Sequence, residues 1–135
     1  MKTFTLRLHD ATRAERIDGV GSFVGEDASG SFGILAGHAR FMTTLSFGLA
    51  RYRIADQPWQ YLALPGAVLY FKDNELGIGA RRYLRDSDYE RISALLAEQL
   101  LAEEEALHGM KESLHRMEEE VLRHLWQLGR EWASQ

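Results

Sequence analysis

Apolar and polar positions alternate with a period of two through the first part of the chain. Leu6 and Leu8 are separated by polar side chains, as in a strand with one buried face. Further short runs of this kind are divided by turn signals such as Asp73-Asn74. Short strands joined by tight turns predict antiparallel hairpins that close into a β-sandwich or flattened barrel. We therefore expect residues 1–85 to form one antiparallel β domain.

From residue 86 onward, apolar residues recur at steps of three and four, which places them on one face of a helix. The segment 86–88 supplies N-cap candidates, and Gly109 separates two apolar stripes. The stripes comprise Tyr89, Ile92, Leu96, Leu100 and Leu107, then Met110, Leu114, Met117, Val121, Leu125, Leu128 and Trp132. The pattern predicts a C-terminal antiparallel two-helix hairpin over residues 86–135, and hence an α+β protein.

Charge divides at the same place along the chain. Residues 1–85 carry 11 basic and 8 acidic side chains, whereas residues 86–135 carry 5 and 12. The net charge of −4 argues against non-specific nucleic-acid binding, which needs a basic face. The lack of cysteine excludes disulfides, thiolate metal sites and cysteine nucleophiles. No apolar run approaches the roughly 20 residues that cross a bilayer, and no signal-peptide pattern opens the chain, so we expect a cytosolic protein.

Candidate catalytic and metal-binding side chains do not assemble into a recognisable motif. His9, Asp10 and His38 could form a site only if their side chains converge. His115 and Glu119 share a helix face, but no third ligand accompanies them. We predict no catalytic residue, no metal site and no cofactor. Two alternatives stay open: a small-ligand enzyme that uses His9, Asp10 and His38, and a free-standing adaptor built from the sandwich and the helical hairpin.

The segment from residue 29 to residue 43 carries the most specific pattern. It reads SGSFGILAGHARFMT and resembles the pattern G-E-x-G-I-x-P-G-H-A-P-x-x-T of the epsilon subunit of F-type ATP synthases. Residues 61–69 resemble the strand, turn and strand of that family, and residues 88–91 resemble its D-x-x-R helix start. The order of parts also matches, so the resemblance extends over the whole chain.

Several positions depart from the family pattern. Ser31 replaces an acidic residue, and Ala36 and Arg40 replace two prolines. The resemblance therefore indicates a divergent branch of the family, such as the alternate sodium-coupled type.

The resemblance implies a non-catalytic part of a rotor. In this family the sandwich binds the gamma subunit through one side and rests on the membrane c-ring with one end, at the cytoplasmic face of the inner membrane. The subunit is peripheral and touches the membrane only through the complex. By position, the implied c-ring-facing residues are Glu26, Asp27, Ser29, Gly30 and Ser31. The implied gamma-facing residues are His38, Arg40 and Thr43.

The resemblance also implies a regulatory role for the helical arm. In relatives the arm reaches the alpha and beta subunits and blocks ATP hydrolysis with basic helix residues. Asp88 and Arg91 match part of a nucleotide-binding motif whose remainder is imperfect here. Residues 86–108 carry one basic and seven acidic side chains. An acidic arm is repelled by an interface that relatives bind with basic residues, because like charges repel. We therefore expect inhibition by this arm to be weak or altered.

Overall fold

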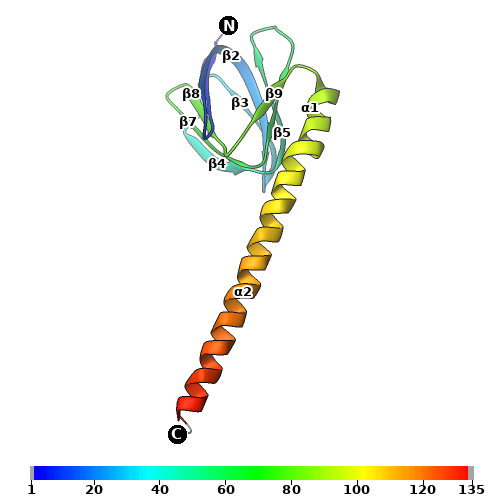
Figure 1. The fold of residues 1–135 in the computed structure, drawn as a ribbon. Coiled ribbons are helices and arrows are strands. Elements are labelled where there is room, and N and C mark those ends of the chain that lie inside the picture. Colours follow the sequence, from blue (N-terminus) through cyan, green and yellow to red (C-terminus); the bar gives the residue numbers. More distant parts are fainter. Residues whose placement is uncertain (1, 134–135) are drawn as a thin grey trace. The chain divides into compact units, whose positions relative to one another are not determined.

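Alternating side chains build nine strands in the part of the chain that the computed structural model describes, residues 2–133, with side chains placed for residues 2–130. The strands are β1 (Phe4–His9), β2 (Ala14–Asp27), β3 (Gly30–Leu35), β4 (Phe41–Leu45), β5 (Gly48–Ile54), β6 (Gln60–Leu64), β7 (Ala67–Lys72), β8 (Glu75–Gly79) and β9 (Leu84–Asp86). Their order is β1-β8-β7-β4-β2-β5-β6-β9, with β3 beside β2 (Figure 1). Because β1 pairs with both β8 and β2, the strands wrap around a common core. All pairings are antiparallel except β1 with β8, so the predicted β-sandwich is confirmed.

The turn between β7 and β8 shows how local sequence sets the register. Lys72 pairs with Glu75, which leaves Asp73 and Asn74 as a two-residue loop. Their φ angles are +50° and +61°. Asp and Asn tolerate this left-handed conformation better than most residues, and the right-handed twist of a hairpin favours it. The turn predicted at this position is therefore confirmed.

The helical part begins where the sequence places its cap. Asp88 accepts hydrogen bonds from the backbone N–H groups of Glu90 at 3.0 Å and Arg91 at 3.2 Å, which satisfies two of the free donors at a helix start. Three consecutive elements follow: α1 (Tyr89–Leu95), a π-helical turn η1 (Leu96–Leu100) and α2 (Leu101–Ala133). By compactness, α1 and η1 belong with the strands in one unit, Met1–Leu101, and the second unit is Ala102–Gln135. The division predicted after residue 85 stays a prediction.

The expected helix break at Gly109 is absent, and α2 runs through this position as one helix. Gly109 is not among the glycines with positive φ, so it does not adopt the left-handed conformation of a C′ residue. Glycine costs a helix interior only about 1 kcal/mol relative to alanine. Its neighbours are mostly strong helix formers such as Leu107, Met110 and Lys111, and they offset that cost. One C-terminal helix is therefore shown where a hairpin is predicted.

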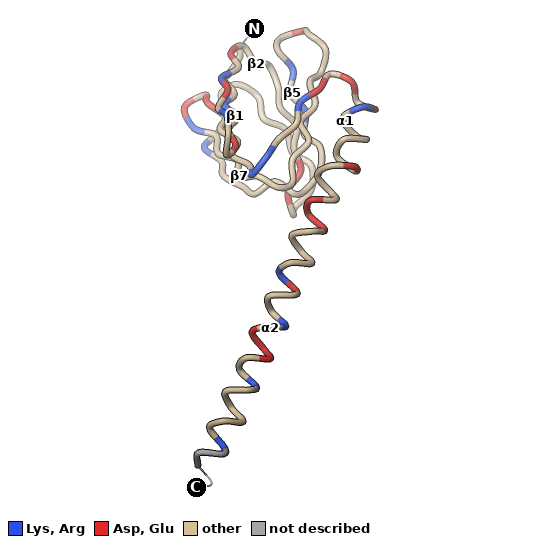
Figure 2. The backbone as a smooth tube through the Cα atoms, in the orientation of Figure 1, with Lys and Arg blue, Asp and Glu red and all other residues tan. Residues whose placement is uncertain are grey.

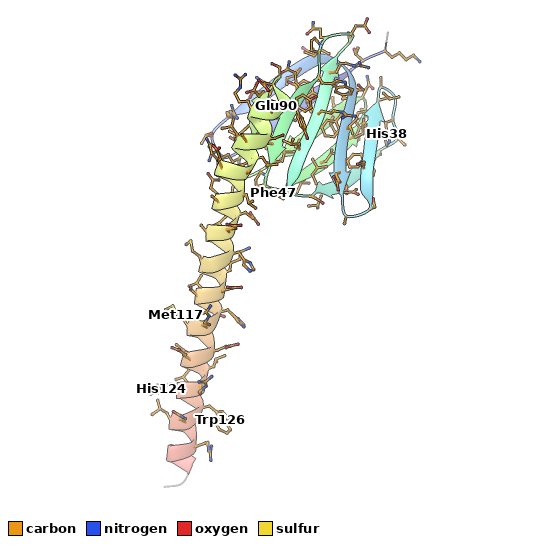
Figure 3. The ribbon with its side chains drawn as sticks, turned by 90° about the vertical axis from the view of Figure 1, so that its right-hand side faces the viewer. His38, Phe47, Glu90, Met117, His124 and Trp126 are labelled. Carbon is orange, nitrogen blue, oxygen red and sulfur yellow. The ribbon has the colours of Figure 1, made fainter. Side chains whose placement is uncertain are left out.

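The apolar stripe of α2 is exposed within its own unit. Leu114, Met117 and Val121 are each about 60% exposed. Acidic and basic residues are interspersed along the helix (Figure 2). Met117 and Trp126 stand out from the ribbon in Figure 3. Trp132, the last predicted member of the stripe, lies outside the residues whose side chains are described. None of the helices in the described residues combines the length and apolar character of a bilayer-spanning segment.

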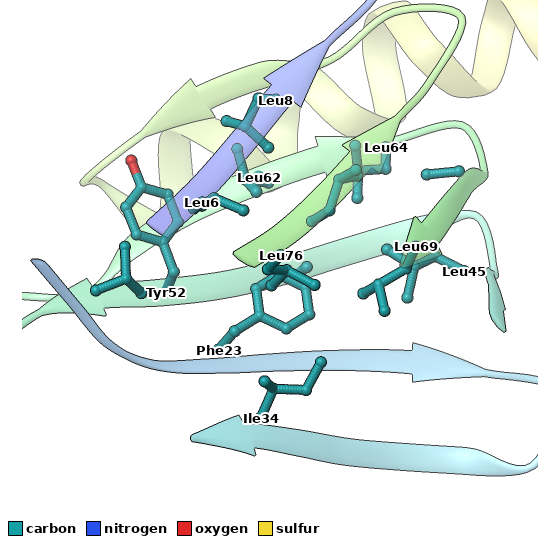
Figure 4. Packing of buried hydrophobic residues seen from close by; sticks show 14 of the residues in the cluster. Leu6, Leu8, Phe23, Ile34, Leu45, Tyr52, Leu62, Leu64, Leu69 and Leu76 are labelled. Atoms are coloured by element: carbon teal, nitrogen blue, oxygen red, sulfur yellow. The ribbon is translucent and has the colours of Figure 1, made fainter. Parts of the chain in front are cut away.

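The core of the sandwich is formed by the inward faces of nearly all strands (Figure 4). No polar or charged residue is fully buried in the described part of the chain. The members with the largest buried side chains are Leu6, Leu8, Phe23, Ile34, Leu62, Leu64, Leu69, Phe71, Leu76, Ile78 and Tyr83. Full burial of such a side chain contributes about 1.5–3 kcal/mol. The sheet therefore has a core of its own that does not depend on the helical part.

A second, smaller cluster attaches α1 and η1 to the outer side of the sheet. Ile92 and Leu100 are fully buried, and they pack with Ala63 of β6. Phe47 and Leu84 border this contact. Because Ile92 and Leu100 are eight residues apart, they lie on one face of the helical segment. This cluster holds the start of the helical part against β6.

Candidate interaction surfaces

The β2–β3 hairpin carries the five residues predicted to face a c-ring. The two strands pair Glu26 with Ser31 and Asp27 with Gly30, so a two-residue loop joins them. Gly30 has a φ angle of +120°, a conformation that residues with a Cβ atom rarely adopt. The structure thus brings all five residues to one hairpin tip. Their contact with a ring stays a prediction.

Asp27 is the hydrogen-bonding centre of this tip. Its carboxylate accepts hydrogen bonds from the backbone N–H of Ser29 at 2.9 Å and from the Ser29 hydroxyl. The hydroxyl of Thr43 on β4 donates to the other carboxylate oxygen at 2.7 Å. These bonds, first that from the Ser29 hydroxyl and then that from Thr43, lower the pKa of the Asp27 carboxyl below its usual range. Thr43, predicted to face gamma, therefore also holds the tip.

His38 and Arg40 precede β4 and line a different part of the surface from the tip. His38 lies on the β domain (Figure 3). Its ring makes edge-to-face contacts with Phe41 and Phe71, at centroid distances of 5.7 Å and 5.8 Å. Its Nδ1 atom lies 2.7 Å from the carbonyl oxygen of Ala39. The structure therefore brings His38 and Arg40 together, but places Thr43 with the tip.

His38 and Arg40 line an open cleft of about 570 Å³. Lys2, just before β1, and Lys72, at the end of β7, also line it, and Asp73 supplies a carboxylate. Within the described part of the chain, no ion pair involves Lys2, Arg40 or Lys72. Neither lysine is indicated by the sequence, because no local pattern joins residues so far apart in the chain.

Asn74 fastens the three segments that form this cleft. Its side-chain amide donates to the carbonyl oxygen of Thr3 at 2.7 Å and accepts from the N–H of Gly37 at 2.9 Å. Its own carbonyl accepts from the N–H of Thr5 at 3.2 Å. One residue, through its side chain and its backbone carbonyl, thus ties β1, the β3–β4 connection and the β7–β8 turn together. The turn signal in the sequence indicated Asn74, but not this role.

Asp88 and Arg91, the predicted nucleotide-binding residues, both have local structural roles. Asp88 caps α1, and the guanidinium of Arg91 pairs with the carboxylate of Asp86 through two nitrogens, one of them at 2.8 Å. The hydrogen bonds from Arg91, and then the one from the backbone N–H of Asp88, lower the pKa of the Asp86 carboxyl well below its usual range. The sequence pattern indicated Asp86 only as a cap candidate, not as the partner of Arg91 in this ion pair.

A partly buried ionic cluster joins β2, β9 and the residue before β9. The Tyr83 hydroxyl donates to Glu15, whose other carboxylate oxygen lies 2.8 Å from the guanidinium of Arg85. The guanidinium of Arg13 lies 4.0 Å above the Tyr83 ring. Burial, then the bond to Glu15, raises the pKa of Tyr83 to about 12. The hydrogen bond from Tyr83 and the charge of Arg85 lower the pKa of Glu15. Every group has a partner, so the cluster is structural.

The alternative of a site at His9, Asp10 and His38 is wrong. The His9 ring lies against Gly79, where an added Cβ atom would be 2.5 Å from Nε2. The Asp10 carboxylate accepts from the N–H of Thr12 at 2.9 Å in a turn. His38 lies with the segment before β1, and six residues of β1 span about 20 Å. Among the described residues, no three His, Asp or Glu side chains are close enough to hold a metal ion.

Comparison with known proteins relates the chain to one family. The family described as "ATP synthase, Delta/Epsilon chain, beta-sandwich domain" matches residues 3–86. The chain is 31% identical over 109 residues to "ATP synthase epsilon chain 2" of Cereibacter sphaeroides, which covers 80% of this chain and 75% of that protein.

Two solved structures share the fold. A chain in the mitochondrial ATP synthase OSCP/F1/c-ring structure of Euglena gracilis matches with a TM-score of 0.59 and 17% identity, over 73% of this chain and 64% of that one. A chain in the central stalk/c-ring structure of the Tetrahymena thermophila mitochondrial ATP synthase matches with a TM-score of 0.51 and 14% identity, over 62% and 69%. From the family match over the sandwich and the relative of similar length, the chain belongs to the epsilon-chain family of F-type ATP synthases.

Proposed function

We propose that the chain is a non-catalytic subunit of the central stalk of an F-type ATP synthase, where it couples the gamma subunit to the membrane c-ring. The observation that carries this proposal is the family match over residues 3–86, which spans the whole sandwich. A part that transmits torque must resist deformation. A β-sheet wrapped around a close-packed apolar core meets this need, because such cores are dense and have low compressibility.

The hairpin tip at residues 26–31 is the part that we assign to the c-ring. Apart from Ala28, its exposed side chains are polar, and the Asp27 carboxylate ties the loop to Thr43 on β4. A tip held in this way can rest against polar loops without deep burial. The side that includes His38, Arg40 and Thr43 faces the gamma subunit in this proposal.

The helical part is assigned to regulation. The apolar stripe of α2 is exposed within its own unit, and such a stripe is usually covered by another helix. We assign it a second state in which residues 86–135 fold into the predicted hairpin. Alternatively, the alpha and beta subunits cover the apolar stripe of α2. The acidic first part of this segment opposes strong inhibition of ATP hydrolysis.

Nucleotide binding at Asp88 and Arg91 is the weakest part of the assignment. Both side chains have intramolecular partners, and a nucleotide would have to displace Asp86 from Arg91. In this proposal the complex holds the chain at the cytoplasmic face of the membrane as a peripheral subunit. The coupling ion, proton or sodium, stays a prediction.

Co-purification tests the proposal. A tagged chain is expressed with the gamma and c subunits of the same organism, and the membrane fraction is isolated in mild detergent. We expect all three subunits to elute together. A chain that elutes without gamma and c would refute the rotor assignment and favour the free-standing adaptor.

A second experiment tests regulation by the arm. Removing residues 102–135 leaves the sandwich and its docked α1 intact. We expect the ATP hydrolysis rate of the assembled enzyme to change by less than about twofold, because like charges oppose docking of the arm. Strong activation would show that the arm inhibits in spite of its charge.

A further inference from the structure

The cleft beside His38 is lined by more cationic than anionic side chains. Three cationic side chains, Lys2, Arg40 and Lys72, line it with one carboxylate, that of Asp73. This excess of two positive charges is most of the net +3 that residues 1–85 carry from 11 basic and 8 acidic side chains. The cleft therefore carries a local excess of positive charge.

The frame of this cleft is held by hydrogen bonds and ring contacts, whereas its cations are exposed and not held in ion pairs within the described residues. Asn74 bonds to Thr3 and Gly37, and His38 is held between two aromatic rings. The cations have exposed, long side chains and no intramolecular carboxylate partner among the described residues. Elsewhere on the sandwich, arginines such as Arg16 and Arg85 already pair with carboxylates. Unpaired cations around a fixed frame are suited to receive carboxylates from outside the chain.

An exposed apolar surface continues from the cleft along β4 and β7. Met42 is 66% and Val68 is 56% exposed. Side chains alternate along a strand, so Val68, Tyr70 and Lys72 share the outward face of β7. Met42 lies opposite Tyr70 in the register of the two strands. A basic cleft that opens onto exposed Met and Val suits a protein segment better than a free inorganic anion.

We propose that this basic cleft is a specificity site that binds a carboxylate-bearing segment of the gamma subunit, with Arg40 and Lys72 as the main recognition residues. The proposal rests on the proposed function, since it names the chemistry through which the sandwich recognises its partner. Arg40 stands where the family pattern has a proline, so this contact distinguishes the chain from relatives that keep the proline. Charges at the rim of an interface mainly set association rate and partner choice.

Charge reversal tests the site in the full-length chain. Binding of purified gamma subunit is measured at low and moderate salt for the wild type, the Arg40→Glu/Lys72→Glu double variant and the neutral Arg40→Gln/Lys72→Gln double variant. We expect charge reversal to lower the affinity at least about tenfold at low salt and the neutral variant to lower it severalfold. The affinity of both variants should depend less on salt than that of the wild type. Arg51→Glu, on β5 away from the cleft, is the matched control and should stay within about twofold.

The outcomes separate this proposal from the function itself. Wild-type affinity in a correctly folded charge-reversal variant overturns the cleft and leaves the rotor assignment standing. A wild-type chain that does not bind gamma at all refutes both. Far-UV circular dichroism checks the folding of each variant. If the charge-reversal variant does not fold, the affinity of the neutral variant decides the test. Competition provides a further test, in which inorganic phosphate and a glutamate-rich peptide are each added to the complex with gamma. If phosphate displaces gamma as effectively as the peptide does, the cleft is a small-anion site, and the proposal that it binds a protein segment is refuted.

Discussion

Truncation of Ile92 tests how firmly the start of the helical part is attached to the sheet. Ile92 and Leu100 are the two fully buried side chains that hold α1 and η1 against β6, where they pack with Ala63. At about 1.5–3 kcal/mol for each fully buried aliphatic side chain, the pair contributes about 3–6 kcal/mol. Replacing a buried isoleucine by alanine costs about 2–5 kcal/mol, including the cavity that remains. Ile92→Ala therefore removes most of the attachment.

The expected result is local release of α1 with the sheet still folded, because the sheet has a separate apolar core. Hydrogen exchange followed by mass spectrometry measures both parts at once. Peptides covering residues 88–100 should exchange at least about tenfold faster in Ile92→Ala, since each 1.4 kcal/mol of lost stability is a factor of ten. Peptides from β1, β7 and β8 should be unchanged.

Leu101→Ala is the matched control, because Leu101 is 40% exposed at the end of the same unit. It should change the exchange of either region by less than about 0.5 kcal/mol. Equal acceleration in the sheet and in α1 would show that the two unfold together. Unchanged exchange in α1 would show that Ile92 does not hold it, and the reasoning from burial would then be wrong.

Three further outcomes follow from groups at or near the candidate surfaces. Because the pKa of Tyr83 is raised to about 12, its contribution to stability should be fully present below the ordinary tyrosine pKa and be lost between about pH 10 and pH 12. Tyr83→Phe should remove this loss in alkaline denaturation. The pKa of Asp86 is lowered, so its contribution should be present above the ordinary aspartate pKa and fall as acid protonates the carboxyl; Asp86→Asn should flatten acid unfolding followed by circular dichroism. Gly30→Val should destabilise the hairpin tip by about 1–2 kcal/mol in urea unfolding, because Gly30 has a φ angle of +120°. Gly33→Val is the control on the same strand, and it should cost less because Gly33 has an ordinary φ angle.

Local sequence determined the parts of the fold that depend on near neighbours. The period of two along β1, the Asp73-Asn74 turn and the Asp88 cap are each set by a few adjacent residues, and the structure has all three. The family motif was equally local, since it lies within residues 29–43. Gly109 is the local signal that misled, because one glycine costs less than its helix-forming neighbours contribute.

Only the tertiary structure decided which distant residues share a surface. Thr43 hydrogen-bonds to Asp27 across two strands, and Lys2 and Lys72 reach one cleft from opposite ends of the β domain. The physical reason is that strand order, set by packing of the common core, brings together segments with no sequence relation. The partner of a charged or hydroxyl side chain cannot be identified from a single sequence. The basic cleft and the fastened hairpin tip therefore follow from the fold and not from any motif.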